Sequence, residues 1–459
     1  MQQGRRRSSF GSSSSLTRTT SLTRRSSISQ RDILLLQQTL EKQQKVSSQL
    51  LFIVSIFLPL FTFFYLYSVH LHAGSFRKTF AQLFRYPFVI QMIPPLNDFV
   101  AWKLALSILS LQLIFHMFLP HDRVLVLSSL GNKWKPVNGF SSTVLLCLLY
   151  SLGSLLGLYR GDVLFLHFNS VAICLALISA CGFFVLLLSY YFGTGNHVTT
   201  VPEFYFGIEA HPTFLDIDLK HFIRTRVTFG FWSLFIISAF HYSHATYGRI
   251  SKSVLCNGGV QLLYILRHSW AEDLYLNALD SKRANLGFYR MWTDMVFYPV
   301  LFTSPITVMI YNNRNLPLIS NIIFTLLTLT SIYITNAIDR QKYEFRKANG
   351  IYKIGNSDPF FITAKYKNDE GEPAANLLLG SGFYSSCRHL NYPMEALTFL
   401  AFCLFQGVTS PLTYLPFIYT TGFLIARVFQ DEARCFIKYG QYWQQYCSKV
   451  PYKLLPGIY

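Results

Sequence analysis

The side chains best suited to chemistry gather late in the chain, inside or beside apolar runs. One group lies before or within a short apolar run and comprises Arg388, His389, Asn391, Tyr392 and Glu395. A second group follows the last apolar run and comprises Arg427, Asp431, Glu432 and Arg434. Ionisable side chains are costly within a membrane, so each marks a candidate site until a partner explains it.

Two pairs of charged residues have helical spacing. Lys342 and Arg346 are four residues apart, so on a helix they share a face where two cations could hold a phosphate. Their alternative role is a positively charged flank that ends a membrane helix. Arg427 and Asp431 have the same spacing, and either form a simple ion pair or orient a ligand.

Metal and nucleotide-loop chemistry have little support. His241 and His244 lack a nearby third ligand in the sequence, and we expect no metal site. The glycines that could suggest a phosphate-binding loop do not follow a predicted strand: Gly193, Gly195, Gly258 and Gly259. A nucleotide would therefore have to be held in another way.

The composition points to a membrane protein. Only 14% of the 459 residues are charged, whereas 51% are hydrophobic and 17% aromatic. A soluble domain carries roughly a quarter charged residues. The composition therefore argues against soluble, fibrous and disordered proteins, and indicates a chain whose outer surface faces lipid.

Ten apolar runs predict the elements that position these side chains. They extend over 51–69, 101–119, 141–158, 163–190, 228–240, 254–266, 288–310, 316–337, 395–405 and 412–427. Several are shorter than the roughly 20 residues of a straight span, so they are expected to be broken or enclosed in the bundle. The predicted fold is an all-α polytopic membrane protein with about ten transmembrane helices.

The net charge is +18, and at the N-terminus seven arginines precede the first acidic residue, Asp32. We interpret residues 1–47 as a disordered Arg/Ser-rich tail, and we expect no nucleic-acid partner. Basic flanks favour the cytosolic side, which places the N-terminus there. An even number of spans places the C-terminus on the same side.

Several motifs resemble the membrane sterol reductase family, which includes the delta-14 and delta-7 sterol reductases and the lamin B receptor. They are "FYFGIEAHP" from Phe204, "LGFYRMWTD" from Leu286, "GSGFYSSCRHLNYPMEALTFLAFCLFQG" from Gly380, and the ending "VPYKLLPGIY". The resemblance is strongest to the delta-7 enzymes and covers residues 202–459 well. It implies that residues 48–200 form N-terminal transmembrane helices and residues 201–459 a reductase core with an NADPH pocket.

The resemblance also implies which residues bind NADPH. The family's phosphate-binding Lys and Arg fall on Lys342 and Arg346, and its Leu and Trp beside the cofactor fall on Leu379 and Tyr384. The remaining expected contacts are Asn391, Tyr392, Arg427, Asp431, Cys435, Phe436, Ile437, Lys438, Tyr439 and Tyr446.

The chain departs from the family pattern at several positions. The family's Gly-Asp is Met394-Glu395 here, its His before the last-helix Arg is Ala426, and the Arg of its Asn-Pro-Arg is Thr213. The resemblance therefore predicts a divergent reductase.

A reduction of this kind needs an acid as well as a hydride. A ring alkene has no carbonyl to accept hydride, so an acid must first protonate one carbon to give a cation. The candidate proton donors are Tyr392, Glu395, Asp294 and Glu209, and the sequence does not choose among them.

The resemblance implies NADPH-dependent reduction of a ring double bond of a sterol, with the delta-7 bond of a delta-5,7-sterol expected. The alternatives are a delta-14-sterol reductase and a non-catalytic scaffold like the lamin B receptor. The expected partners are a sterol from the bilayer, membrane lipid and other enzymes of sterol biosynthesis. The expected location is the endoplasmic reticulum membrane, whereas the Arg/Ser tail alone could also suggest an organelle transit peptide.

Overall fold

The chain is mostly helical in its computed structural model. The structure describes residues 47–83, 96–128, 131–194, 198–278, 281–282, 284–367, 371–407 and 411–458. These residues belong to one compact unit, Lys45–Tyr459. The predicted basic tail, residues 1–47, lies outside the described residues except for Ser47.

Every predicted apolar run forms helix. The long α-helices are α2 (Ser48–His72), α5 (Phe99–Phe118), α6 (Gly139–Leu155), α8 (Phe168–Ser189), α11 (Phe229–Tyr247), α12 (Lys252–Trp270), α16 (Tyr298–Tyr311), α17 (Leu318–Lys347), α18 (Asn391–Leu404) and α19 (Leu415–Tyr439). The shorter α-helices are α3 (Phe76–Leu83), α7 (Val163–Leu166), α9 (Val201–Phe206), α10 (Leu219–Phe222), α13 (Glu272–Asn277), α15 (Phe288–Trp292) and α20 (Gln441–Lys449).

Other helical types interrupt or extend these helices. Three stretches are π-helical: η1 (Tyr190–Thr194), η2 (Ile223–Thr228) and η3 (Thr293–Phe297). Two short 3₁₀ turns are η4 (Gly382–Ser385) and η5 (Pro411–Tyr414). Stretch η2 joins α10 to α11, and η3 joins α15 to α16, so each widens one turn of a continuous helix.

Six of the described helices are long and apolar enough to cross a membrane. They cover Ser48–His72, Phe99–Phe118, Phe168–Gly193, Phe288–Tyr311, Leu318–Lys347 and Pro411–Tyr439. The shorter apolar helix α6, together with α11, α12 and α18, falls outside this set. The structure thus agrees with a helical, membrane-type chain with six candidate spans, rather than with a demonstrated ten.

The central helix of the bundle is the continuous segment Phe288–Tyr311. Its apolar stretch is buried along its whole length, whereas only 22% of the apolar windows in Ser48–His72 and Pro411–Tyr439 is buried. A helix that is apolar all round must be enclosed by other helices, and this one packs against α2, α11, α12 and α19. Residues from both sides of position 200 join one hydrophobic core, from Tyr65 in α2 to Phe405 after α18.

Three antiparallel hairpins in the described part of the chain qualify the all-helical prediction. They are β1 (Asp122–Ser128) with β2 (Gly131–Val137), β3 (Thr213–Phe214) with β4 (Ile217–Asp218), and β5 (Phe361–Lys367) with β6 (Pro373–Leu379). In the last hairpin Phe361 lies opposite Leu379 and Lys367 opposite Pro373. Each pair of strands forms a separate two-stranded sheet, so the hairpins do not join into a larger sheet.

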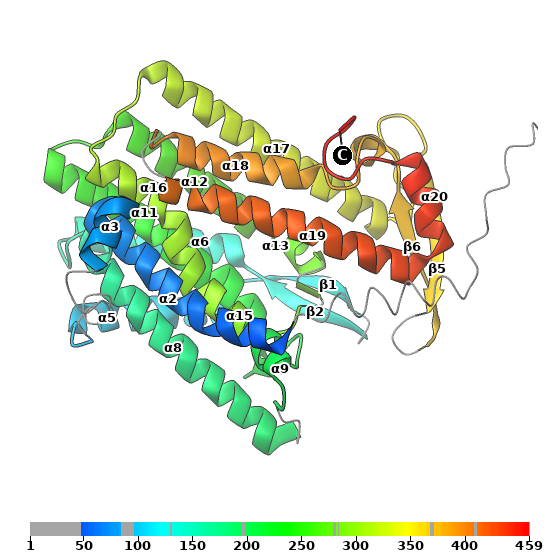
Figure 1. Ribbon diagram of the computed structural model, residues 1–459, viewed down its shortest axis with the longest axis horizontal. Coiled ribbons are helices and arrows are strands. Elements are labelled where there is room, and N and C mark those ends of the chain that lie inside the picture. Colours follow the sequence, from blue (N-terminus) through cyan, green and yellow to red (C-terminus); the bar gives the residue numbers. More distant parts are fainter. Residues whose placement is uncertain are drawn as a thin grey trace, which may run out of the picture. The chain divides into compact units, whose positions relative to one another are not determined.

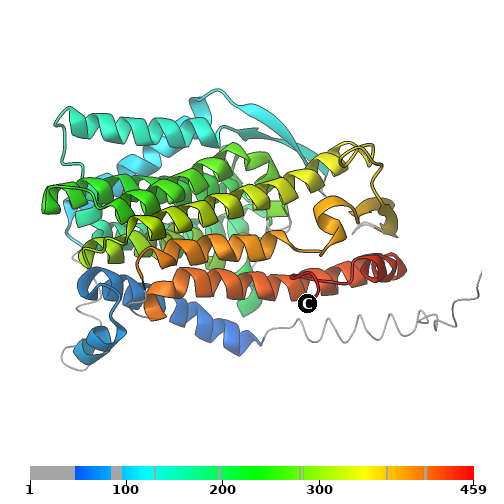
Figure 2. The same ribbon diagram turned by 90° about the horizontal axis from the view of Figure 1, so that it is seen from above.

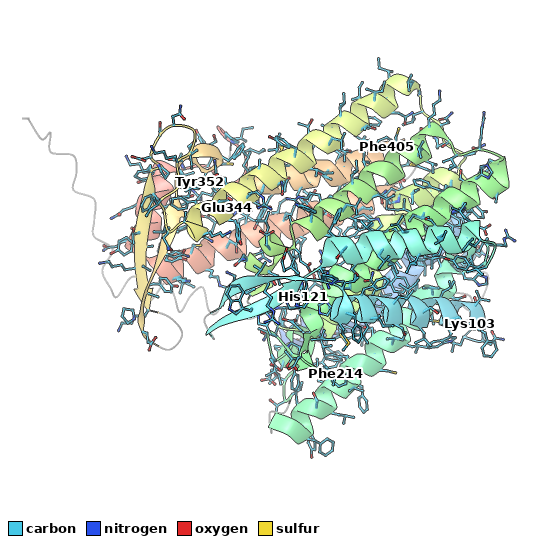
Figure 3. The ribbon with its side chains drawn as sticks, turned by 180° about the vertical axis from the view of Figure 1, so that it is seen from behind. Lys103, His121, Phe214, Glu344, Tyr352 and Phe405 are labelled. Atoms are coloured by element: carbon cyan, nitrogen blue, oxygen red, sulfur yellow. The ribbon has the colours of Figure 1, made fainter. Side chains whose placement is uncertain are left out.

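Three helices near the C-terminus position the candidate site. Helix α18 packs between α17 and α19, and the hairpin β5–β6 with α20 lies beside the ends of α17 and α19 (Figures 1 and 2). Seen from behind, Glu344 and Tyr352 lie at the end that carries the hairpin, whereas Lys103 and Phe405 lie toward the opposite end (Figure 3). Helix α17 continues to Lys347, beyond the end of the apolar run at residue 337.

Candidate functional site

Lys342 and Arg346 lie on the last turns of α17, as their spacing predicted. The ammonium nitrogen of Lys342 lies 5.3 Å from the centre of the Tyr384 ring, close enough for a cation–π contact. Among the described residues, neither cation has a carboxylate within ion-pair distance, whereas Arg340 on the same helix pairs with Glu344 at 3.5 Å and with Asp273 at 3.8 Å. Lys342 and Arg346 therefore remain available to an anion.

The turn that carries Tyr384 is held against α17. The backbone N–H of Phe383 donates a hydrogen bond of 3.0 Å to Gln341 Oε1. Gly382 has φ +64°, and a Cβ there would lie 2.4 Å from the Gln341 side chain, so this close approach requires glycine. Tyr384 is buried with Leu379, Phe345 and Ile338. The structure thus brings Lys342, Leu379 and Tyr384 together.

Burial also sets the chemistry of this tyrosine. Burial raises the pKa of Tyr384 well above its ordinary value, because the phenolate would lose its hydration. Tyr384 therefore stays a neutral phenol at physiological pH and offers a flat aromatic face beside Lys342.

The predicted residues at the start of α18 face α17 and α19. Asn391 Nδ2 donates to Asp339 Oδ1 at 2.9 Å, and the Tyr392 hydroxyl donates to Asp431 Oδ2 at 3.1 Å. Arg427 Nε lies 3.9 Å from the same Asp431 oxygen, a loose version of the predicted ion pair. Asp431 is thus positioned by a neighbouring helix as well as by its own.

The C-terminal segment fixes the start of α18. Arg388 makes a two-pronged contact with Glu432, with distances of 2.7 and 3.0 Å, and donates to the carbonyls of Val450 and Pro451. The backbone N–H of Arg388 also bonds the Tyr452 carbonyl at 3.0 Å. This clamp immediately precedes Asn391 and Tyr392, so the ending of the chain orients them.

The later predicted cofactor residues lie under the hairpin β5–β6. Tyr439, Tyr446 and Trp443 form a buried cluster with Ala364, and Cys435 and Phe436 pack against it. The Tyr446 hydroxyl donates to the Leu379 carbonyl at 2.8 Å, which links α20 to the strand that leads to Tyr384. The ammonium of Lys438 lies 3.9 Å from the centre of the Tyr366 ring on β5. Ile437 is half-buried on the same helix.

The proton-donor candidates have different surroundings. Asp294 is buried between two guanidinium groups, 2.9 Å from Arg224 Nη1 and 3.3 Å from Arg290 Nε. Glu395 instead accepts a short hydrogen bond from the Tyr264 hydroxyl, and His268 Nε2 lies 4.0 Å away. Asp294 is therefore a paired carboxylate, whereas Glu395 belongs to a chain of hydroxyl, carboxyl and imidazole groups.

Tyr264 is a site residue that the sequence pattern did not indicate. It lies on α12 within an apolar run, and its ring contacts Trp232, Phe399 and Phe402, so it looks like a core residue. The feature of the sequence that could have pointed to Tyr264 is the pair of polar residues after it. Arg267 and His268 end a short and interrupted apolar run. Glu209, the fourth candidate, lies in the segment after α9 and its backbone carbonyl accepts from Leu286 N at 2.9 Å.

Comparison with known proteins identifies the family. The model of the "Ergosterol biosynthesis ERG4/ERG24 family" matches residues 41–459, and the chain belongs to this family. The match extends well before residue 202, where the recognised motifs begin. The predicted family is confirmed, and with it the predicted class of enzyme, an oxidoreductase.

Curated relatives carry two different names. The chain is 29% identical to 7-dehydrocholesterol reductase of Arabidopsis thaliana, over 80% of this chain and 86% of that protein. It is 34% identical to 7-dehydrocholesterol reductase of Xenopus laevis, over 56% of this chain and 54% of that protein. It is 30% identical to delta(14)-sterol reductase of Methylotuvimicrobium alcaliphilum, over 56% of this chain and 58% of that protein. The chain thus spans about half the length of the latter two relatives, and the names leave the reduced bond open.

Proposed function

We propose that this chain uses NADPH to reduce a ring double bond of a sterol, and that this bond is the delta-7 bond of a delta-5,7-sterol. The observation that carries the proposal is the pair Lys342 and Arg346, two cations on one helix without a carboxylate within ion-pair distance among the described residues, with Lys342 beside the buried Tyr384 ring. The proposal agrees with relatives named 7-dehydrocholesterol reductase.

The residues around α17 fit a phosphorylated dinucleotide. Lys342 and Arg346 would hold its phosphate groups through charge-assisted hydrogen bonds, and the face of Tyr384 with Leu379 would hold a flat ring. Asn391, Tyr392 and Asp431 offer polar groups from two further helices for orientation. The proposed contacts also include Arg427, Tyr446 and the stretch Cys435 to Tyr439. When bound, NADPH supplies the hydride.

The proposed proton donor is the Glu395–Tyr264 pair. Asp294 is already engaged by the two guanidinium groups of Arg224 and Arg290. The Tyr392 hydroxyl already points its proton at Asp431. The Tyr264 hydroxyl donates a hydrogen bond to Glu395 between α12 and α18, next to the rings of Trp232 and Phe399. Aromatic faces stabilise the carbon cation that protonation of an alkene creates.

The proposed donor can be tested without disturbing the cofactor contacts. Glu395→Gln keeps the volume and the hydrogen bond acceptor but cannot donate the proton, so turnover should be lost while NADPH affinity stays within about twofold. Glu395→Asp, the family's own acid, is the matched control and should retain turnover. Full turnover of Glu395→Gln would rule out this donor.

The direction of the helices supports the proposed placement in the membrane. Helix α2 runs antiparallel to α17 and α19, so the start of α2 lies at the same end of the bundle as the ends of α17 and α19 (Figures 1 and 2). A cytosolic N-terminus would therefore put Lys342, Arg346 and Asp431 toward the cytosol, where NADPH is available. The proposed location is the endoplasmic reticulum membrane, with both termini cytosolic and with the sterol entering from the bilayer.

Sterol profiling tests the proposed reaction. Cells that lack sterol reductases of this kind would express the chain and receive either a delta-5,7-sterol or a delta-14-sterol. Loss of the conjugated-diene absorbance of the delta-5,7-sterol is the expected result. An unchanged diene with loss of the delta-14-sterol would move the assignment to the second candidate, which the relative named delta(14)-sterol reductase favours. No change in either sterol would favour the scaffold hypothesis.

A further inference from the structure

A polar cavity lies at the end of the bundle opposite the candidate site. Its volume is about 1030 Å³. It is formed by the end of α2, the turn into α3, and the segment that follows α16. The lining residues are His70, Leu71, His72, Ala73, Ser75, Lys78, Tyr311, Asn312, Asn313, Arg314 and Asn315.

The lining is cationic. Lys78 and Arg314 contribute two charges, and none of the described lining residues is acidic. Three asparagines and two histidines supply further hydrogen-bond donors. The cavity therefore offers an anion two cationic side chains together with several amide groups.

Both walls of the cavity are held in place. In the α2–α3 turn, the Thr79 hydroxyl donates to Ser68 Oγ at 3.0 Å. Gly74 has φ +79°, and a Cβ there would lie 2.5 Å from Thr413. On the other wall, Ser251 Oγ donates to the Arg314 carbonyl at 3.2 Å. The cationic groups are therefore presented by a preformed frame.

The rim of the cavity is apolar and exposed. Leu71 lines the cavity and is 56% exposed, while Phe76 and Phe80 of α3 stack with ring centres 5.5 Å apart and are also exposed. Helix α3 thus has aromatic residues on one face and carries Arg77 and Lys78, which is typical of a helix at a membrane surface. The apolar rim and the cationic lining together match an amphiphile with an anionic head.

We propose that this cavity binds the phosphate headgroup of an anionic membrane lipid, with Lys78 and Arg314 contacting the phosphate and the acyl chains lying along Leu71, Phe76 and Phe80. A free phosphate ion would satisfy the same cations but would leave the exposed aromatic rim unused. This site is independent of the proposed reductase activity, because none of its residues belongs to the cofactor or proton-donor groups.

Native mass spectrometry of the delipidated full-length protein in a neutral detergent tests the site. The probes are phosphatidic acid, phosphatidylcholine and inorganic phosphate. Each cation near a lipid surface contributes a factor of about five in affinity, so Lys78→Gln with Arg314→Gln should reduce phosphatidic acid binding at least tenfold. The matched control, Arg77→Gln with Lys252→Gln, removes the same charge from exposed positions that do not line the cavity and should bind as the wild type does.

Each result bears on the proposal. Preference for phosphatidic acid over phosphatidylcholine, lost only in the cavity variant, supports it. Equal loss in both double variants would show a diffuse charge effect and overturn the site. Equal binding of the two lipids, or binding of inorganic phosphate with no lipid preference, would overturn the lipid headgroup as the ligand. Thermal unfolding of each variant confirms that it is folded, and the single variant Arg314→Gln replaces the double variant if that protein does not fold.

Discussion

Two charged regions of the molecule differ in how completely their charges are paired. At Glu272, which is fully buried, the carboxylate accepts hydrogen bonds from Arg226, His221 and the backbone N–H of Gly139. Arg226 in turn donates to Asn138 at 2.8 Å. At the end of α17, Lys342 lies over the Tyr384 ring, and among the described residues neither Lys342 nor Arg346 has a carboxylate within ion-pair distance.

The contrast separates charges that support the fold from charges that await a ligand. A buried charge is tolerated when it is paired and hydrogen-bonded, and removing its partner is then strongly destabilising. A charge left without a partner contributes little to folding and gains its partner on binding. Substitutions around Glu272 should therefore lower the stability of the protein. Substitutions at the end of α17 should instead lower the affinity for the cofactor or the turnover.

The largest expected effect is on stability, from Glu272→Gln. The substitution keeps the shape but leaves the buried Arg226 guanidinium with an uncompensated charge, so it should lower the free energy of unfolding by about 3–5 kcal/mol. The control is Glu344→Gln, which alters a half-exposed pair with Arg340 and should change the same quantity by less than about 0.5 kcal/mol. Thermal unfolding in detergent compares them, and equal melting temperatures would contradict the structural role of Glu272.

Acid should remove the same contribution. Burial alone would raise the pKa of Glu272. The Arg226 guanidinium and His221 together lower this pKa by more than burial raises it, so it lies far below its ordinary value of 4.5. A carboxylate with a depressed folded-state pKa stabilises the fold above its unfolded-state pKa, and that stability is lost as the pH falls toward the folded value. The stability difference between wild type and Glu272→Gln should therefore shrink below about pH 4.5. A difference that stays constant down to pH 3 would be inconsistent with this assignment.

The next largest effect is expected from Asp431→Asn, and it should appear in catalysis. The carboxylate accepts from Tyr392 at 3.1 Å and has only a loose contact with Arg427. If Asp431 orients the cofactor, its loss should reduce turnover by about a hundredfold or more. As a half-buried ion pair alone it would contribute at most ~1 kcal/mol of stability. NADPH binding, turnover and melting temperature of one purified variant distinguish the two roles, and normal binding with normal turnover would leave only the ion pair.

The smallest effect should follow deletion of the residues before Asp32. An Arg/Ser-rich segment without apolar anchors cannot shape a pocket among the C-terminal helices. Turnover of the truncated protein should match that of the full chain, while its localisation or regulation can change. Its Arg-Arg-Ser-Ser runs suit phosphorylation, which would cancel local positive charge. A truncated protein that inserts correctly but is inactive would refute this prediction.

The sequence predicted the helices better than the strands and helix ends. Apolar runs located every long helix, because burial in a membrane or a bundle core leaves a strong compositional signal. Strand β5 contains Lys365 and Lys367, and β6 shows no alternation of polar and apolar residues, so the hairpin lacks a clear strand pattern. The π-helical stretches η2 and η3, which meet at Arg224 and Asp294, depend on the packing of two distant segments.

The candidate site was predictable only in part. Helical spacing alone linked Lys342 with Arg346 and Arg427 with Asp431, because those contacts are local in sequence. The contact of Lys342 with Tyr384 spans 42 residues and that of Tyr264 with Glu395 spans 131. Family resemblance suggested Tyr384, but nothing in one sequence pairs Tyr264 with Glu395.

The central claim, that unpaired cations at the end of α17 hold NADPH, is tested most directly by titrating NADPH into Lys342→Ala, Arg346→Ala and Arg340→Ala. Arg340 lies on the same helix but is already paired with Glu344 and Asp273. Charge-assisted hydrogen bonds to phosphate predict that Lys342→Ala and Arg346→Ala each raise the Kd for NADPH about tenfold or more, at unchanged melting temperature. Arg340→Ala should bind as the wild type does. Wild-type affinity in both Lys342→Ala and Arg346→Ala, or the same loss in all three variants, would contradict the site.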